Sequence, residues 1–148
     1  MMEEQRIRDF LRESNHIEGI EEEPTEDQIE VTRWFLAQEA IQLVDVVALA
    51  NVHQKDASLR NLAGMDVRVG RYIAPRGGPD IERSLEKLLS TAYKMPPLEL
   101  HIEFENLHPF MDGNGRTGRV LWLWAMKGEA PLGFLHTFYY QVLDAQAR

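Results

Sequence analysis

Apolar residues recur at helical spacing through most of this 148-residue chain. From Val31 a repeat of about 3.6 residues continues as far as Val52, which predicts one long core helix over that stretch. Thr25 and Gln28, just after Pro24, are spaced as a capping box at the start of this helix. Similar stripes predict further helices over residues 81–92, 98–107, 116–126 and 134–145. We therefore expect a mostly α-helical fold.

Length and composition limit the classes of function. The length corresponds to about one domain. The chain has no cysteine, which excludes disulfides, thiolate metal sites and a cysteine nucleophile. Its net charge of −8 argues against a nucleic-acid partner, because phosphate backbones are bound through clustered lysine and arginine. Apolar runs such as Val120 to Met126 are far shorter than the ~20 residues that span a bilayer, so we expect no membrane partner and a cytoplasmic location.

Residues 64–79 differ from the helical segments around them. Val67 and Val69 alternate with polar residues, and the segment then becomes rich in glycine and proline. This pattern is typical of a short hairpin or an extended loop.

The residues from His108 to Arg119, HPFMDGNGRTGR, place a glycine-rich turn before two arginines. Backbone N–H groups around Gly113 and Gly115 can converge on an anion because no side chain blocks the approach. If a helix begins near Arg116, its first N–H groups and its dipole favour the same anion. Arg116 and Arg119, three residues apart, would project from one face of that helix. The segment therefore predicts a phosphate-binding site.

Two further residues of this segment carry chemistry. Asp112 directly precedes the turn, and Mg²⁺ is commonly held by one or two carboxylates together with phosphate oxygens. An ordinary histidine side chain titrates near neutral pH, so His108 is a candidate to accept a proton from an attacking hydroxyl group.

The segment resembles, at every fixed position, the HPFx(D/E)GN(G/K)RxxR motif of Fic-domain proteins. The resemblance implies a Fic-like helical bundle with a short β-hairpin flap, which in the family pairs with the backbone of the target protein. It also implies that His108 deprotonates the incoming hydroxyl and that Asp112 positions Mg²⁺. Phosphate binding would then fall to the glycine-rich turn and the arginines, namely Gly113, Asn114, Gly115, Arg116 and Arg119.

Glu18 interrupts the apolar stripe of a helix predicted near the N-terminus. The stripe has helical spacing and consists of Ile7, Phe10, Leu11, Ser14 and Ile17. A buried carboxylate needs a cation or water, and Arg116 and Arg119 are the natural candidates. Gly19 should end this helix.

The string SNHIEG, with Ser14, Glu18 and Gly19 at its fixed positions, resembles the (S/T)xxxE(G/N) inhibitory motif of many Fic proteins. The resemblance implies that Glu18 reaches Arg119 and blocks the γ-phosphate of ATP. Residues 1–22 would then form an N-terminal inhibitory helix, and residues 23–148 a single compact Fic catalytic core.

The activity implied by the resemblance is transfer of AMP from Mg–ATP to a hydroxyl side chain of a target protein. The identity of the target protein is left open, and the chain itself is one candidate. Whether the protein forms a homodimer is also left open. So are removal of AMP, transfer of another nucleotide, and a binding module that only responds to nucleotide. A kinase-like variant, which typically has lysine in place of Gly115, is disfavoured. A metal hydrolase would use His101, Glu105 and His108, which share one helical face but lack the HExxH pattern.

Overall fold

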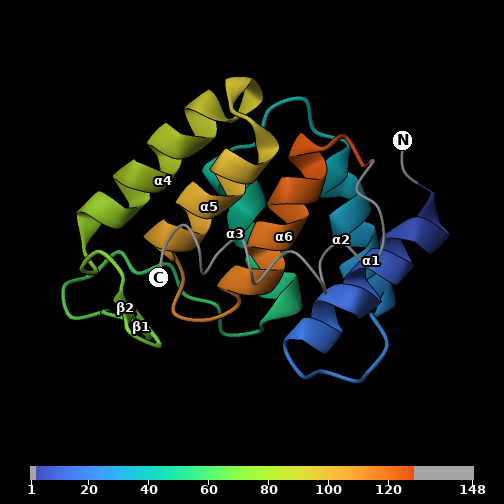
Figure 1. Cartoon of the computed structure of the whole chain (residues 1–148), viewed down its shortest axis with the longest axis horizontal. Helices are drawn as coiled ribbons and strands as arrows, with labels where there is room; N and C mark the ends of the chain where they lie inside the picture. The colour runs from blue at the N-terminus through green and yellow to red at the C-terminus, as the bar shows by residue number, and fades with distance from the viewer. Residues whose placement is uncertain (1–2, 129–148) are drawn as a thin grey trace.

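Helix α6 (Asn114–Ala125) is the central element of the fold and directly follows the glycine-rich turn. The structure is a computed structural model that describes residues 3–128. Four helices surround α6 (Figure 1): α1 (Glu4–Ile17), α2 (Glu26–Leu36), α3 (Leu43–His53) and α5 (Pro97–Leu107). Val120, Leu121 and Leu123 of α6 are completely buried. The bundle therefore fixes the position of α6, and with it the position of the motif.

The remaining helices extend the bundle on the side of α5. Helix α4 (Pro79–Thr91) packs against α5 and continues into the 3₁₀ helix η1 (Ala92–Lys94). Both α4 and α5 begin with proline, whose fixed φ suits the first helical position. The prediction of a mostly α fold is confirmed, while the helix predicted over residues 134–145 lies outside the described residues. Within residues 3–128 no helix is long and apolar enough to cross a bilayer.

The single long helix predicted from Val31 to Val52 is wrong, because α2 ends at Leu36 and α3 begins at Leu43. The backbone turns between them, and the Gln38 carbonyl accepts a hydrogen bond of 2.8 Å from Trp124 Nε1. Helix α3 also has its own start signal, a capping box between Gln42 and Asp45. The apolar period continued through the turn because Ile41, in the connection, is also buried. The capping box at Thr25 and Gln28 is confirmed.

The predicted hairpin is confirmed as strands β1 (Arg68–Val69) and β2 (Tyr72–Ile73). The strands are antiparallel, with Val69 opposite Tyr72. Gly70 in the turn has φ of +61°, a conformation that glycine adopts without strain. The Tyr72 hydroxyl donates a hydrogen bond of 2.6 Å to the Asn106 carbonyl in the last turn of α5. The hairpin is thus tied to the end of the helix that leads into the motif (Figure 1).

Arg60, in the loop between α3 and β1, is completely buried and joins three segments of the chain. Its Nε donates to the His108 carbonyl at 2.7 Å and its Nη2 to the Leu107 carbonyl at 2.9 Å. Its Nη1 donates to the Met65 and Pro75 carbonyls, at 2.9 and 2.8 Å, on the two sides of the hairpin. Burial lowers the pKa of Arg60, as expected for a cation that is held mainly by neutral carbonyl groups.

We expect Arg60→Met to lower the free energy of unfolding by about 3 kcal/mol, because it leaves several buried carbonyl groups without their donor. Urea unfolding followed by circular dichroism measures the change. Arg76→Met, at an exposed arginine, removes the same charge and should stay within about 0.5 kcal/mol of the wild type. Equal effects of the two substitutions would contradict a structural role of the Arg60 hydrogen bonds.

Candidate active site

The motif forms a tight loop between α5 and α6. His108 caps the C-terminus of α5 in the left-handed conformation, with φ of +50°, and Gly113 precedes α6 with φ of +83°. The Asn114 side chain closes the loop from inside, because it donates to the Phe110 carbonyl at 2.7 Å and accepts from the Phe110 N–H at 2.9 Å. Phe110 itself is completely buried. The loop is therefore held in one shape by its own sequence.

Helix α6 begins at Asn114, two residues before the predicted start near Arg116. The first N–H groups of a helix have no acceptor within the helix, so those of Asn114, Gly115 and Arg116 face the space in front of α6. The side chain of Asn114 is committed to Phe110, so any contact of this residue with an anion would come from its backbone. The Asp112 carboxylate accepts from the Gly113 N–H at 2.8 Å.

Two glycines of α6 are explained by close approach. A Cβ atom at Gly115 would lie 2.6 Å from the Glu18 carboxylate and 3.2 Å from the Arg119 guanidinium. A Cβ atom at Gly118 would collide with the Glu105 carboxylate and lie 3.0 Å from the Phe104 ring. Gly115 therefore leaves room at the anion site, whereas Gly118 allows α5 and α6 to pack closely.

The N-terminal motif and the active-site motif meet at Arg119, whose side chain is almost completely buried. Arg119 Nε donates to Ser14 Oγ at 2.6 Å, and its Nη2 donates to the Ser14 carbonyl at 3.2 Å and to Glu18 Oε2 at 2.5 Å. Short charge-assisted bonds of this kind are among the stronger hydrogen bonds in proteins. Of the two arginines predicted as partners of Glu18, the structure thus pairs it with Arg119.

Gly19 places Glu18 at this point. Glu18 is the last residue of the α1 cap, and Gly19 follows in the left-handed conformation with φ of +76°. The N–H groups of Gly19 and Ile20 donate to the carbonyls of His16 and Asn15, which is the Schellman pattern of a helix C-terminus. The predicted end of the helix at Gly19 is therefore confirmed.

The first arginine of the motif, Arg116, contacts the residue that caps the C-terminus of α3. Its Nη2 donates to Gln54 Oε1 at 3.0 Å, and only 8% of the residue is exposed. Burial lowers the pKa of Arg116, while the nearby Glu18 carboxylate raises it in part. The C-terminal ends of α1 and α3 thus meet the N-terminal end of α6, so the helix dipoles complement one another around the arginines.

His108 and Asp112 lie at the edge of this site. The His108 backbone is fixed on both sides, because its N–H donates to Phe104 and its carbonyl accepts from Arg60. Its side chain is half-buried. Asp112 is exposed beside the glycine-rich turn, as suits one carboxylate that shares Mg²⁺ with phosphate oxygens.

The alternative metal-hydrolase site is not formed. Within residues 3–128 no three histidine, cysteine, aspartate or glutamate side chains gather closely enough to hold a metal ion. His101 and Glu105 are both buried, and His101 Nδ1 lies 2.8 Å from the Gly118 carbonyl. These two side chains serve the packing of α5 against α6.

Three contributors to the site were not predicted from the sequence, namely His53, Gln54 and Arg60. Gln54 and Arg60 lie far from the motif in the chain, and a lone glutamine or arginine in a loop gives no pattern. His53 follows the apolar period of α3 and is one of its buried residues. The packing of α3 against α6 brings His53 and Gln54 to the motif. Arg60 reaches it from the loop after α3, through its hydrogen bonds to Leu107 and His108.

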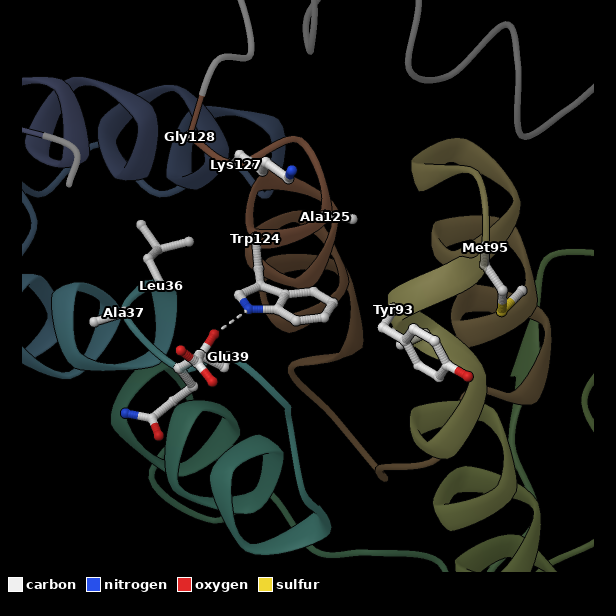
Figure 2. Close-up of a pocket in the computed structure, with 11 residues that line it drawn as sticks. Leu36, Ala37, Glu39, Tyr93, Met95, Trp124, Ala125, Lys127 and Gly128 are labelled. Atoms are coloured by element: carbon white, nitrogen blue, oxygen red, sulfur yellow. Dashed lines mark hydrogen bonds between the residues drawn. The ribbon is translucent and has the colours of Figure 1, made fainter.

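A cavity of about 560 Å³ lies at the end of α6 opposite the glycine-rich turn (Figure 2). Its lining includes Tyr93, Met95 and the Trp124 ring, whose Nε1 forms the hydrogen bond to Gln38 described above. Because α6 has 12 residues, the cavity lies roughly 18 Å from the glycine-rich turn. It is therefore separate from the residues predicted to bind phosphate.

The buried His53 has a pKa that is shifted by its burial and by the two arginines of the site. Neither of its ring nitrogens has a hydrogen-bond partner among the described residues, and burial, together with the charges of Arg116 and Arg119, lowers its pKa to about 3. Between pH 6.5 and 3 the unfolded chain binds a proton at this histidine that the folded protein excludes. The contribution of His53 to stability therefore falls as the pH falls.

When the pH is lowered from 7 to 5, we expect the free energy of unfolding of the wild type to fall by about 2 kcal/mol because of His53. His53→Gln should lack this loss. Urea unfolding of both proteins at the two pH values gives the difference directly. The same pH dependence in both proteins would contradict a neutral, buried His53.

Comparison with known protein families agrees with this geometry. Residues 66–126 match the sequence model of the Fic/DOC family. The match covers the hairpin, α4, α5, the motif loop and α6, and so includes His108, Asp112 and both arginines. Helices α1, α2 and α3 lie outside the match, and so do Ser14, Glu18 and Gln54. From the motif, the helical architecture and this match, we conclude that the chain contains a Fic domain, which the match places at residues 66–126.

Proposed function

We propose that the protein transfers AMP from Mg–ATP to a hydroxyl side chain of a target protein, and that Glu18 inhibits this reaction. One observation carries the proposal: the Glu18 carboxylate contacts both Arg119 and the open face at Gly115, in front of the first turn of α6. A carboxylate here stands in for an anionic phosphate group. The position it holds is the one that a helix N-terminus with two arginines would offer to a polyphosphate.

The phosphate groups of ATP would bind along the glycine-rich turn. The backbone of Gly113, Asn114 and Gly115 would contact the α- and β-phosphates, and Arg116 and Arg119 the β- and γ-phosphates. Asp112 would hold Mg²⁺, which supplies charge neutralisation on the phosphate oxygens. The γ-phosphate and Glu18 would then compete for Arg119, which accounts for the inhibition.

His108 would accept the proton of the target hydroxyl. The hydroxyl oxygen then attacks the α-phosphorus, the bond from this phosphorus to the bridging oxygen breaks, and pyrophosphate leaves. The rigid backbone of His108, held by Phe104 and Arg60, supports this role because a general base must stay within hydrogen-bond reach of the hydroxyl. Positioning and charge stabilisation supply most of the catalysis.

A second candidate is removal of AMP from a modified protein by the same site. Glu18 favours it in one respect, because 38% of its side chain is exposed and its carboxylate can orient a water molecule. The kinase-like alternative is less favoured, since position 115 is glycine, where the kinase-like variant typically has lysine.

We expect Glu18→Gly to raise AMP transfer at least about tenfold, because it releases Arg119 for the γ-phosphate. Intact-protein mass spectrometry after incubation with Mg²⁺ and ATP, alone and in lysate, detects the added AMP. Glu22→Gly, at an exposed glutamate four residues away, is the matched control and should behave as the wild type. Equal transfer by wild type and Glu18→Gly would refute inhibition by Glu18, and a gain of phosphate would indicate the kinase-like reaction.

In the Glu18→Gly background, we expect His108→Ala to lower AMP transfer by about 10²- to 10⁴-fold, because the general base is lost. ATP affinity, measured by calorimetry, should change little. Since residue 108 has positive φ, His108→Asn is the second variant, because asparagine tolerates this conformation. Retained transfer in both variants would exclude His108 as the base.

A further inference from the structure

A smaller cavity, of about 280 Å³, lies between the hairpin and the α4–α5 pair. This volume is just below the ~300–1,000 Å³ of small-molecule sites, so it suits a single long side chain. Figure 1 shows the hairpin beside the N-terminal end of α4 and the C-terminal end of α5. The lining residues used below come from these three elements and from the loop after β2: Tyr72, Pro75, Ser84, Leu88, Glu103 and Asn106.

Two acceptors among the polar groups of this cavity are open to a ligand with N–H donors. Asn106 Oδ1 is buried and has no hydrogen-bond partner among the described residues. The Glu103 carboxylate is exposed and forms no ion pair within residues 3–128. The Ser84 hydroxyl adds a group that can donate or accept. A buried acceptor near a carboxylate matches a ligand that carries several N–H donors and a positive charge.

The rest of the lining matches an aliphatic chain. Leu88, Pro75 and the Tyr72 side chain supply apolar surface. Lysine and arginine combine a hydrocarbon stem with a cationic end that carries several donors. The hydrocarbon stem of such a side chain thus matches the apolar lining of this cavity, and its cationic end matches the acceptors.

The cavity is also close to the proposed base. Asn106 precedes His108 by two residues, and its carbonyl accepts the Tyr72 hydroxyl of the hairpin. An extended peptide advances about 3.3 Å per residue and presents alternate side chains to the same face. A peptide with its hydroxyl at His108 can therefore place a side chain a few residues away in this cavity.

We propose that the cavity binds a lysine or arginine side chain of the target protein, on the same segment as the modified hydroxyl. This proposal rests on the proposed function and adds the chemical class of the target sequence. Glu103 binds the cationic end, Asn106 accepts a further hydrogen bond, and Leu88 and Tyr72 contact the stem. The net charge of −8 also favours approach of a basic segment.

The test uses fluorescently labelled peptides that contain one serine, threonine or tyrosine, with lysine placed in turn at each position from three before to three after it. Norleucine at the same position keeps the stem and removes the charge. Each peptide is assayed with the Glu18→Gly protein in two ways, by AMP transfer in mass spectrometry and by binding in fluorescence anisotropy. The variants are Glu103→Gln and, as matched control, Glu99→Gln, an exposed glutamate on α5 outside the cavity lining.

We expect lysine at one position to raise both binding and transfer at least about fivefold over norleucine, as for a partly exposed charge-assisted contact. Glu103→Gln should bring the ratio of lysine peptide to norleucine peptide close to one, both in binding and in transfer. Glu99→Gln should leave this ratio unchanged. Asn106→Asp, which adds a negative charge, should raise the ratio.

Each other outcome identifies what has failed. Transfer without any preference for lysine, or a preference that Glu103→Gln and Glu99→Gln change equally, overturns the basic subsite and leaves the proposed function standing. A lysine preference in binding without AMP transfer to peptide or protein supports the subsite and overturns the proposed function. Neither binding preference nor transfer overturns both.

Discussion

The buried guanidinium of Arg119 needs hydrogen-bond acceptors, and anionic ones suit it best; this requirement links the two ends of the site. Desolvation of an isolated charge is costly, so a carboxylate or phosphate beside the side chain is favoured. In this structure Glu18 and Ser14 are its partners. A polyphosphate at the N-terminus of α6 would meet the same need. The C-terminal end of α1 and the proposed γ-phosphate are thus alternatives at one position.

Arg60 meets the same physical problem in a different way. It too is fully buried, but its guanidinium donates to four backbone carbonyls instead of a carboxylate side chain. Those carbonyls belong to the end of α5, to His108 and to both sides of the hairpin. Such a partner set does not change when a ligand binds. Arg60 is therefore suited to a permanent structural role, whereas the Arg119 pair is suited to a switch.

The features that could be predicted from sequence are those encoded in neighbouring residues. Gly19 ends α1, Thr25 and Gln28 cap α2, and the glycine-rich turn precedes α6, because each depends on local backbone geometry. The carboxylate on an apolar stripe predicted a cationic partner for Glu18, either Arg116 or Arg119, and the resemblance to the inhibitory motif of Fic proteins implied Arg119, which the structure shows. The break between α2 and α3 was missed because Ile41 continues the buried pattern through the turn.

Contacts set by tertiary packing could not be predicted in this way. Arg60 lies 48 residues from His108 along the chain, and Gln54 lies 62 residues from Arg116. Neither has a local partner that would mark it. The hairpin was predicted from valines that alternate with polar residues and from the glycine and proline that follow them. Its attachment through Tyr72 to the carbonyl of Asn106, by contrast, depends on where α5 ends relative to β2. The cavity beside this attachment is likewise a product of packing.

The way α1 is attached bears on how inhibition would be released. Ile7, Phe10 and Leu11 are buried in the core, and each such side chain contributes roughly 1.5–3 kcal/mol when it is removed from water. The Glu18 carboxylate, by contrast, is partly exposed at the very end of the helix. Movement of the last turn of α1 would free Arg119 without removing the apolar stripe from the core. The apolar residues of α1 therefore serve the fold, and the proposed inhibitory contact is confined to the last turn and cap, where a local change would be enough to open the site.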